Sequence, residues 1–194
     1  MSFDHTSRQP LKAMDSKDQV MYIKSFSKIL MPGLRLGLTI APAPLNHGIG
    51  AAKQFSDISS SGLLQRTLDL YLREKTWHQH IQAMQKFYSA RCQAALKALA
   101  EYLPQEVRFT APGGGLHLWL KLPQGITGDE LYQQCLKEDV LITPGSFFAP
   151  SGLYDQWIRL SYAAAGEDEI IKGVKIMGRI LKEKNAPHTI QPLL

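Results

Sequence analysis

The residues best suited to chemistry gather near the start of the chain, in segment 25–35 (SFSKILMPGLR). Lys28 follows the apolar run Val20–Ile23, which predicts a buried strand, so its ammonium is expected at a strand end where water is displaced. An amine held there can form an imine with an aldehyde. Ser25 and Arg35 supply a hydroxyl and a forked, permanently charged donor set, which suit a phosphate group. An aldehyde partner and a phosphate together predict a site for pyridoxal 5'-phosphate (PLP).

The segment also matches a longer pattern, S-x-S-K-x-x-x-P-G-x-R-x-G, which ends at Gly37. This pattern resembles the cofactor-lysine segment of fold-type I PLP enzymes, the class I/II aminotransferase family. The sequence is also close in style to the aminotransferase-like domain of MocR/GntR-type regulators. The resemblance runs from about Pro10 to Lys184, and it includes a second landmark at 157–162 (WIRLSY). The arginine of that strand binds the substrate α-carboxylate in the family, so the resemblance assigns this role to Arg159.

The resemblance implies a role for each site residue. Lys28 is the expected catalytic residue, which holds the cofactor and then moves the Cα proton of the substrate. Ser25, Ser27 and Arg35 are the expected cofactor-binding residues, and Arg159 is the expected substrate-binding residue. For Ser27 two alternatives stay open, since its hydroxyl suits either the phosphate or a cap for the turn after the strand. No metal is expected at the site.

The implied fold class is α/β, the C-terminal part of a PLP-dependent transferase fold. It comprises the end of the large-domain sheet, a long linking helix and a small α/β domain with antiparallel strands. The expected divisions are a remnant of the large PLP-binding domain at 1–75, the linking helix at 76–104, the small domain at 105–185 and a loose tail at 186–194. Family members are about twice as long, so the chain resembles their C-terminal half. The N-terminal half supplies the partner of the pyridine nitrogen.

Three functions are compatible with these residues. The first is an aminotransferase that moves amino groups between an amino acid and a 2-oxo acid, with this chain inactive on its own. The second is an effector-sensing PLP domain of a MocR/GntR-type transcriptional regulator, which contacts nucleic acid only through an upstream domain. The third is an inactive fragment that only pairs with a partner. Exposed apolar strand edges tend to be covered by another chain, so a homodimer or higher assembly is expected. The resemblance points the same way, since the active site of the family lies at a dimer interface.

The amino-acid composition narrows the possible classes of protein further. With 194 residues, of which 44% are hydrophobic and 20% charged, the chain can bury a core and is not expected to be disordered. The net charge of +5 comes from scattered basic residues, which do not form a nucleic-acid-binding run. Cys92 and Cys135 are far apart and form no CxxC motif, so free thiols and a cytoplasmic location are expected. No apolar run approaches the length of a membrane span.

The first half of the chain predicts strands followed by helices. The nearly continuous apolar runs 20–23 and 34–41 favour strands of a sheet covered on both faces. Ser61 is the predicted N-cap of a following helix. Apolar residues recur every three or four positions over 81–103, and this stripe predicts a long helix with a buried face. Pro104 is expected to end that helix.

The second half predicts a small sheet and two helices. The predicted strands are 107–110, 116–122, 140–143 and 157–162. Alternation in 116–122 puts the leucines on one face and Trp119 on the other, and in 157–162 it puts Trp157 and Arg159 on one face. Thr127 and Glu130 have the spacing of a capping box, which predicts that a helix begins there. The final helix is predicted over 167–184, where acidic residues occupy the first turn and lysines the last.

Two other chemistries are disfavoured. His78 and His80 are separated by two positions, so on a helix their rings point about 200° apart and do not share a metal ion. The G-x-S-x-G pattern of a hydrolase nucleophile is absent from the sequence.

Overall fold

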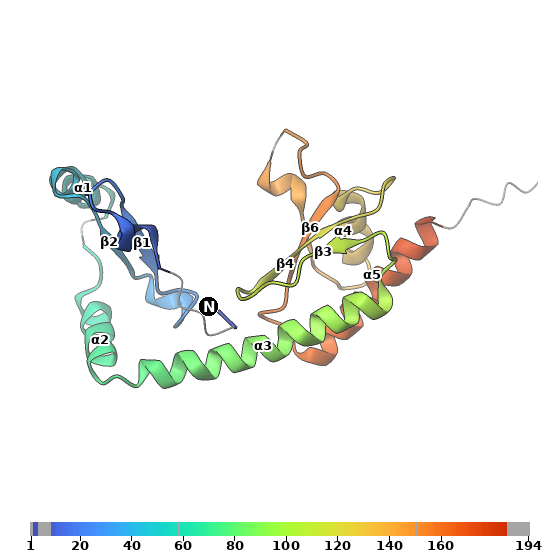
Figure 1. The fold of residues 1–194 in the computed structure, drawn as a ribbon, viewed down its shortest axis with the longest axis horizontal. Helices are drawn as coiled ribbons and strands as arrows, with labels where there is room; N and C mark the ends of the chain where they lie inside the picture. Colours follow the sequence, from blue (N-terminus) through green and yellow to red (C-terminus); the bar gives the residue numbers. More distant parts are fainter. Residues whose placement is uncertain (1, 4–8, 58, 150, 186–194) are drawn as a thin grey trace, which may run out of the picture. The chain divides into compact units, whose positions relative to one another are not determined.

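The computed structural model describes residues 2–3, 9–57, 59–149 and 151–185. The predicted loose tail at 186–194 lies outside the described residues. The chain divides into two compact units, one within residues 5–84 and the other comprising residues 2–4 and 85–194. Their α-helices and most of their strands are labelled in Figure 1.

The first unit contains a two-stranded antiparallel sheet followed by helices. In chain order its elements are η1 (Leu11–Met14), β1 (Tyr22–Ser25), η2 (Pro32–Leu34), β2 (Gly37–Ile40), α1 (Ala43–Ser56), α2 (Gly62–Arg73) and the first turns of α3 (Trp77–Tyr102). Tyr22 is opposite Ile40 and Ser25 is opposite Gly37 in the sheet. The Ser61 hydroxyl accepts a hydrogen bond from the Leu64 amide and caps α2, which confirms the predicted N-cap.

The two strands of this sheet are exposed. No residue of β1 or β2 is buried, and the Ile23 side chain is 71% exposed. The sequence predicts strands covered on both faces, and the described residues do not supply that cover. Apolar residues on both faces of a strand are typical of an interior position in a larger sheet, and the described residues supply only the one hairpin.

The second unit is built on a four-stranded sheet with the strand order β3-β4-β6-β5, antiparallel throughout. Its elements are β3 (Arg108–Phe109), β4 (His117–Lys121), α4 (Gly128–Leu136), β5 (Thr143–Pro144), η3 (Gly145–Phe148), β6 (Trp157–Ser161) and α5 (Glu167–Asn185), together with the rest of α3. The predicted small α/β domain with antiparallel strands is confirmed.

One face of this sheet forms the core. Leu118 and Leu120 of β4 and Ile158 of β6 are at most 1% exposed. They belong to one cluster with buried residues of the helices, among them Leu99 of α3 and Met177 of α5. Alternate strand residues point to opposite faces, so the residues between them, including Trp119 and Arg159, share the other face. The alternation in the sequence predicted this division, and the structure confirms it.

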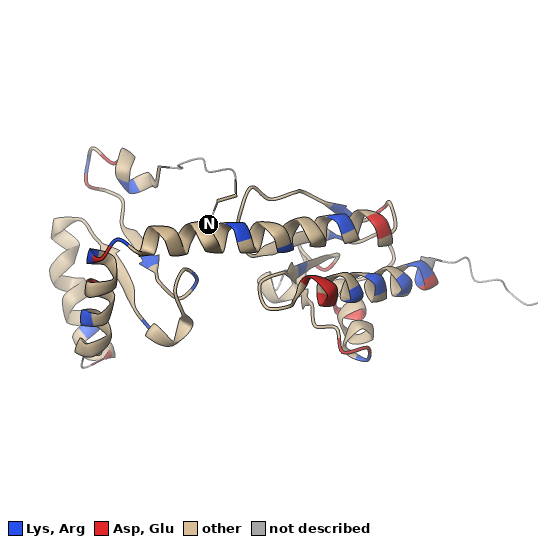
Figure 2. Cartoon of the chain, turned by 90° about the horizontal axis from the view of Figure 1, so that it is seen from below, with Lys and Arg blue, Asp and Glu red and all other residues tan. Residues whose placement is uncertain are grey.

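The helix ends follow the predicted signals. The Thr127 hydroxyl accepts from the Glu130 amide, and the Glu130 carboxylate accepts from the Thr127 amide, so the capping box is complete. The hydrogen bond from the Thr127 amide is the main reason that the pKa of Glu130 is lowered. Figure 2 shows the acidic start and the basic residues along α5, as the macrodipole favours.

One predicted strand is misplaced. The strand expected at 140–143 with Pro144 as its end is observed as β5, which includes Pro144. Proline lacks the amide proton that a ladder needs, and it is tolerated where the sheet ends. β5 lies at the edge of the sheet, next to β6 alone, so Pro144 is compatible with pairing to Ile158.

A close approach of helices gives a first testable prediction. A Cβ atom at Gly178 would collide with the carbonyl oxygen of Tyr102 at the end of α3, whereas one at Gly173 would make an ordinary contact with Val140 at 3.6 Å. We expect Gly178→Ala to lower the free energy of unfolding by about 1–3 kcal/mol. Gly173→Ala, the matched control in α5, should change it by at most about 1 kcal/mol, toward stability. Equal effects in denaturant unfolding would contradict this packing.

The hydrogen bonds that the Asp15 carboxylate accepts in the first unit, which we call the clasp, give a second prediction. The Asp15 carboxylate accepts from the amides of Gln19 (3.0 Å) and Val20 (2.9 Å) and from Lys12 Nζ (3.0 Å), which lowers its pKa below the usual 3.8. A lowered pKa means that the clasp is fully formed above about pH 4 and is lost only as the pH falls through the lowered value. A carboxyl-carbon NMR titration of Asp15 should show this low midpoint. A midpoint near 4 would contradict the clasp.

Both cysteines are free and buried. Burial raises the pKa of Cys135 to about 11 and also raises that of Cys92, so neither thiol is primed as a nucleophile. Among the residues that the structure describes, no helix combines the length and apolar character that crossing a membrane requires.

Candidate functional site

The predicted cofactor segment is a loop closed at its base by β1 and β2. Ser25, the last residue of β1, pairs with Gly37, the first residue of β2. One step into the loop, the Phe26 amide donates to the Leu36 carbonyl at 3.2 Å. The two ends of segment 26–36 are therefore held together by a hydrogen bond. The predicted cofactor-binding side chains lie on this loop or directly before it.

Lys28 lies in a tight turn directly after β1. The amides of Ile29 and Leu30 both donate to the Phe26 carbonyl, at 3.2 and 2.9 Å, which fixes the backbone on either side of the lysine. The lysine side chain is exposed in the described chain. The turn therefore presents the amine at the end of a strand, as the sequence predicts, but without the burial expected there.

The two serines of the loop have different tasks in the structure. The Ser25 hydroxyl oxygen accepts a hydrogen bond from the Ser27 amide at 3.2 Å, so it is Ser25 that caps the turn. Accepting this bond leaves the hydroxyl hydrogen of Ser25 available to donate. Ser25 can thus hold the turn and bind an anion at the same time.

Arg35 has an unusual backbone conformation. Its φ of 49° and ψ of 30° place it in the left-handed region, and its amide donates to the Pro32 carbonyl at 3.3 Å to close η2. A non-glycine residue in this region costs about 1–2 kcal/mol, so such residues often mark functional sites. Two residues later, a Cβ atom at Gly37 would lie 3.2 Å from the Lys24 carbonyl oxygen. The glycine therefore permits close backbone packing beside Arg35.

These groups are a suitable donor set for PLP. The loop offers an amine for an aldehyde, and a hydroxyl hydrogen and a guanidinium for a phosphate. All three belong to the short stretch from Ser25 to Arg35, whose ends are tied together by the β1–β2 pairing. The residues present thus fit the cofactor by chemistry.

Arg159 is placed in the second unit, on β6. It is opposite Trp119 of β4 and Thr143 of β5, on the face of the sheet away from the core. One terminal nitrogen, Nη2, donates to Thr143 Oγ1 at 3.4 Å, and the guanidinium lies over the Phe148 ring at 5.1 Å. The Nε atom is buried and has no hydrogen-bond partner among the described residues. A buried, unpaired donor of a charged group is costly, and a carboxylate would satisfy it.

A cluster of aromatic rings adjoins Arg159 through Phe148, and no sequence motif singles it out. Trp119 stacks on Trp157 at 5.6 Å and makes edge contacts with Phe148 and Tyr154. The alternation in the sequence already separated Trp119 from the leucines of β4, and it put Trp157 and Arg159 on one face of β6. The missing signal was the register, which sets Trp119 directly opposite Arg159.

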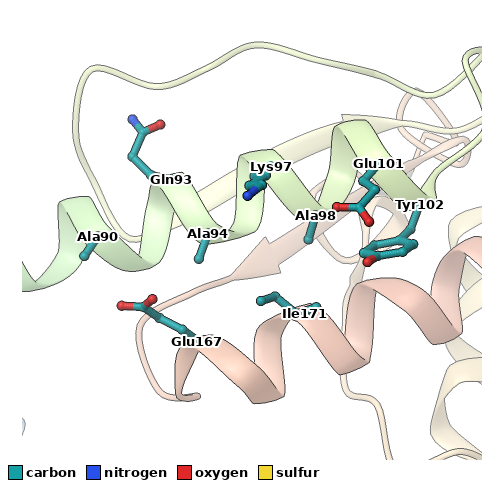
Figure 3. A pocket seen from close by; sticks show the side chains of 9 residues that line it. All are labelled: Ala90, Gln93, Ala94, Lys97, Ala98, Glu101, Tyr102, Glu167 and Ile171. Carbon is teal, nitrogen blue, oxygen red and sulfur yellow. The ribbon is translucent and has the colours of Figure 1, made fainter.

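A groove in the second unit is separate from these residues. It has a volume of about 510 Å³ and lies between α3 and the first half of α5 (Figure 3). Ala94 and Ala98 of α3 and Ile171 of α5 contribute to its lining. None of the predicted site residues lines it. No group of three or more potential metal ligands occurs in the described part of the chain.

Comparisons with known proteins place the chain among aminotransferases and related regulators. It is 36% identical to the 2-aminoadipate transaminase of Thermus thermophilus over 84% of this chain and 41% of that protein. It is 33% identical to the uncharacterized HTH-type transcriptional regulator YdfD of Bacillus subtilis, over 93% of this chain and 37% of that protein. The chain thus spans about two-fifths of the length of these curated relatives.

Solved structures agree with the sequence comparisons. Kynurenine aminotransferase of Pyrococcus horikoshii, solved in complex with PMP, matches with a TM-score of 0.90 and 30% identity over 95% of this chain and 46% of that one. LysN of Thermus thermophilus, an α-aminoadipate aminotransferase complexed with N-(5'-phosphopyridoxyl)-L-leucine, matches with a TM-score of 0.85 and 33% identity over 94% of this chain and 48% of that one. These ligands confirm the PLP prediction at the level of the family. The family model for aminotransferase class I and II matches residues 1–175, and the chain belongs to this family.

Proposed function

We propose that this chain carries the cofactor lysine and two anion sites of a PLP-dependent aminotransferase-like protein. Its reaction is the transfer of an amino group between an amino acid and a 2-oxo acid. The observation that supports this most strongly is the closed loop that presents Lys28 with the donors Ser25 and Arg35. The aminotransferase relatives support the same reaction class.

The roles of the loop residues follow from their chemistry. When bound, PLP supplies an aldehyde that reacts with amines and a ring that accepts electrons from the substrate Cα. Lys28 is the attachment point for the aldehyde, and its Nζ, once neutral, takes the Cα proton of the amino acid. Ser25, Ser27 and Arg35 would bind the phosphate.

Arg159 binds the α-carboxylate of the amino acid. A guanidinium offers parallel N–H donors that match the two carboxylate oxygens. Its buried Nε has no partner in the described chain, and the Phe148 ring beneath it restricts the side chain. The donors are thus held ready for an anion, which reduces the ordering cost of binding.

The test is an amino-transfer assay on two proteins. The first is the full-length parent, meaning the protein that carries this chain together with the N-terminal half of the family. Supplied with PLP, an amino acid and a 2-oxo acid, the full-length parent is expected to transfer the amino group from one to the other. The 194-residue chain alone is expected to be inactive, because the resemblance implies that the N-terminal half of the family's proteins supplies the partner of the pyridine nitrogen. Transfer by the isolated chain would contradict that dependence. A full-length parent that retains PLP but does not transfer would overturn the aminotransferase in favour of a regulator.

The regulator is the second candidate, and the similarity to YdfD over 93% of this chain favours it. An effector-sensing domain needs the lysine, the phosphate site and the carboxylate site, but it does not need turnover. The coding sequence upstream of Met1 distinguishes the candidates. A helix-turn-helix of GntR type would support the regulator, and a phosphate-binding loop joined directly to a start codon would support the enzyme.

We also propose how the chain is organised and assembled. Residues 1–75 belong to the large PLP-binding domain, 76–104 to the linking helix and 105–185 to the small domain. A cytoplasmic homodimer is the proposed assembly, and the apolar side chains exposed in the first unit support it: Phe55 is 92% exposed and Leu63 is 76% exposed. Light scattering should report a dimer or larger assembly, and a monomer would refute it.

A further inference from the structure

A histidine of α3 contacts the turn that carries Lys28. His80 Nε2 lies 2.9 Å from the carbonyl oxygen of Ile29, the residue that directly follows the lysine, and the contact is partly buried. The two residues are 51 positions apart in the chain. We propose that His80 is a positioning residue for Lys28, an inference that rests on the proposed function of this lysine.

The His80 contact anchors the turn to a helix, which the local hydrogen bonds of the loop do not do. The amides of Ile29 and Leu30 both return to the Phe26 carbonyl, and these bonds tie the turn only to its own beginning. The hydrogen bond from His80 ties the other side of Lys28 to a helix. With both sides of the lysine anchored, its Cα cannot shift along the loop without breaking a hydrogen bond.

The chemistry of the contact requires a hydrogen on Nε2 of the imidazole. A backbone carbonyl oxygen only accepts, so His80 Nε2 must carry the hydrogen and donate. Both the Nε2–H neutral tautomer and the imidazolium meet this requirement, so the bond persists whether or not the ring is protonated. The Tyr71 ring meets the imidazole edge-on, with centroids 6.5 Å apart and an angle of 80° between the planes, and it limits the rotation of the ring.

His78 provides a matched control on the same turn of α3. Its ring stacks on the neighbouring Trp77 ring, with centroids 3.6 Å apart. Positions i and i+2 of a helix point about 200° apart. The pair does not fit a metal site for that reason, and the same geometry gives the two histidines separate environments.

The experiment compares His80→Leu, His80→Gln and His78→Leu in the full-length parent. Two quantities are measured: the fraction of Lys28 labelled by PLP and borohydride at subsaturating PLP, and the deuterium exchange rate of the amides at 29–30. His80→Leu is expected to reduce labelling and to speed exchange by about 3- to 10-fold, the size expected for one lost hydrogen bond. His80→Gln, whose amide can still donate, should recover most of both, and His78→Leu should match the wild type.

The outcomes separate this inference from the proposed function. Unchanged labelling and exchange in His80→Leu would overturn the positioning role, as would a failure of glutamine to recover either quantity. If wild-type Lys28 is not labelled at all, the proposed function fails, while the exchange rates still report the contact. Should His80→Leu not fold, long-range ¹H–¹⁵N spectra of the wild type decide: a protonated Nε2 in the neutral ring supports the contact, and a protonated Nδ1 overturns it.

Discussion

Replacing Lys28 by alanine in the full-length parent is expected to abolish covalent attachment of PLP and to lower amino transfer by about 10²–10⁴-fold. The substitution removes both the amine that attaches the aldehyde and the base that moves the Cα proton. Lys28 lies in a turn whose backbone is set by hydrogen bonds from Ile29 and Leu30 to Phe26, so loss of the side chain should leave the loop itself in place. The measurements are PLP absorbance and the rate of amino transfer.

Lys24 is the matched control for this prediction. It lies four residues earlier on β1, opposite Leu38, and its side chain is also exposed. Lys24→Ala should retain both attachment and transfer. If the two variants lose activity equally, the lysine at position 28 has no special role, and the assignment would be wrong.

The second large effect concerns the two arginines. Arg35→Ala is expected to weaken PLP retention by about 10- to 100-fold, whereas Arg159→Ala is expected to weaken amino-acid binding by a similar factor. A hydrogen bond to a charged group contributes roughly 1.5–3 kcal/mol, which converts to these ratios. PLP dissociation and the amino-acid concentration dependence of transfer measure the two effects separately.

Arg66→Ala serves as the control for loss of a positive charge. This arginine is exposed on α2 and pairs with Asp69 at 2.9 Å, so its removal should leave both binding steps unchanged. Exchanged phenotypes, in which Arg159→Ala alone releases PLP, would refute the assigned roles. Equal losses of PLP from all three variants would show that general charge, rather than a specific contact, retains the cofactor.

The fold of the second unit could be predicted in detail because it buries its own core. Alternation in β4 and β6 separated the two faces of each strand, of which the structure buries the one with Leu118 and Ile158, and the capping box at Thr127 identified the start of α4. In these segments each local signal agrees with the packing that the chain itself provides. Such agreement makes short patterns informative.

Prediction was less successful for segments whose packing or strand pairing depends on residues distant in the sequence. The apolar runs around β1 and β2 predicted covered strands, but the described chain leaves both exposed. The limits of β5 were missed since the edge position that tolerates Pro144 follows from strand order. Strand order depends on contacts between distant segments, and no local sequence pattern reports it.

The candidate site shows the same contrast between features set by local sequence and features set by distant contacts. Ser25, Lys28 and Arg35 were identifiable because they lie on one continuous segment, which β1 and β2 then close into a loop. Arg159 was assigned by resemblance, and its neighbour Phe148 became visible only in the structure. The contact from His80 to Ile29 likewise links residues that no local pattern connects.

The most direct test of the central claim is to locate the covalent attachment of PLP. The full-length parent is incubated with PLP, reduced with borohydride and digested, and the modified peptide is identified by mass. We predict that the pyridoxyl group is found on Lys28 and that reduction removes the absorbance of the bound cofactor. A pyridoxyl group on any other lysine, or none on the protein, would contradict it.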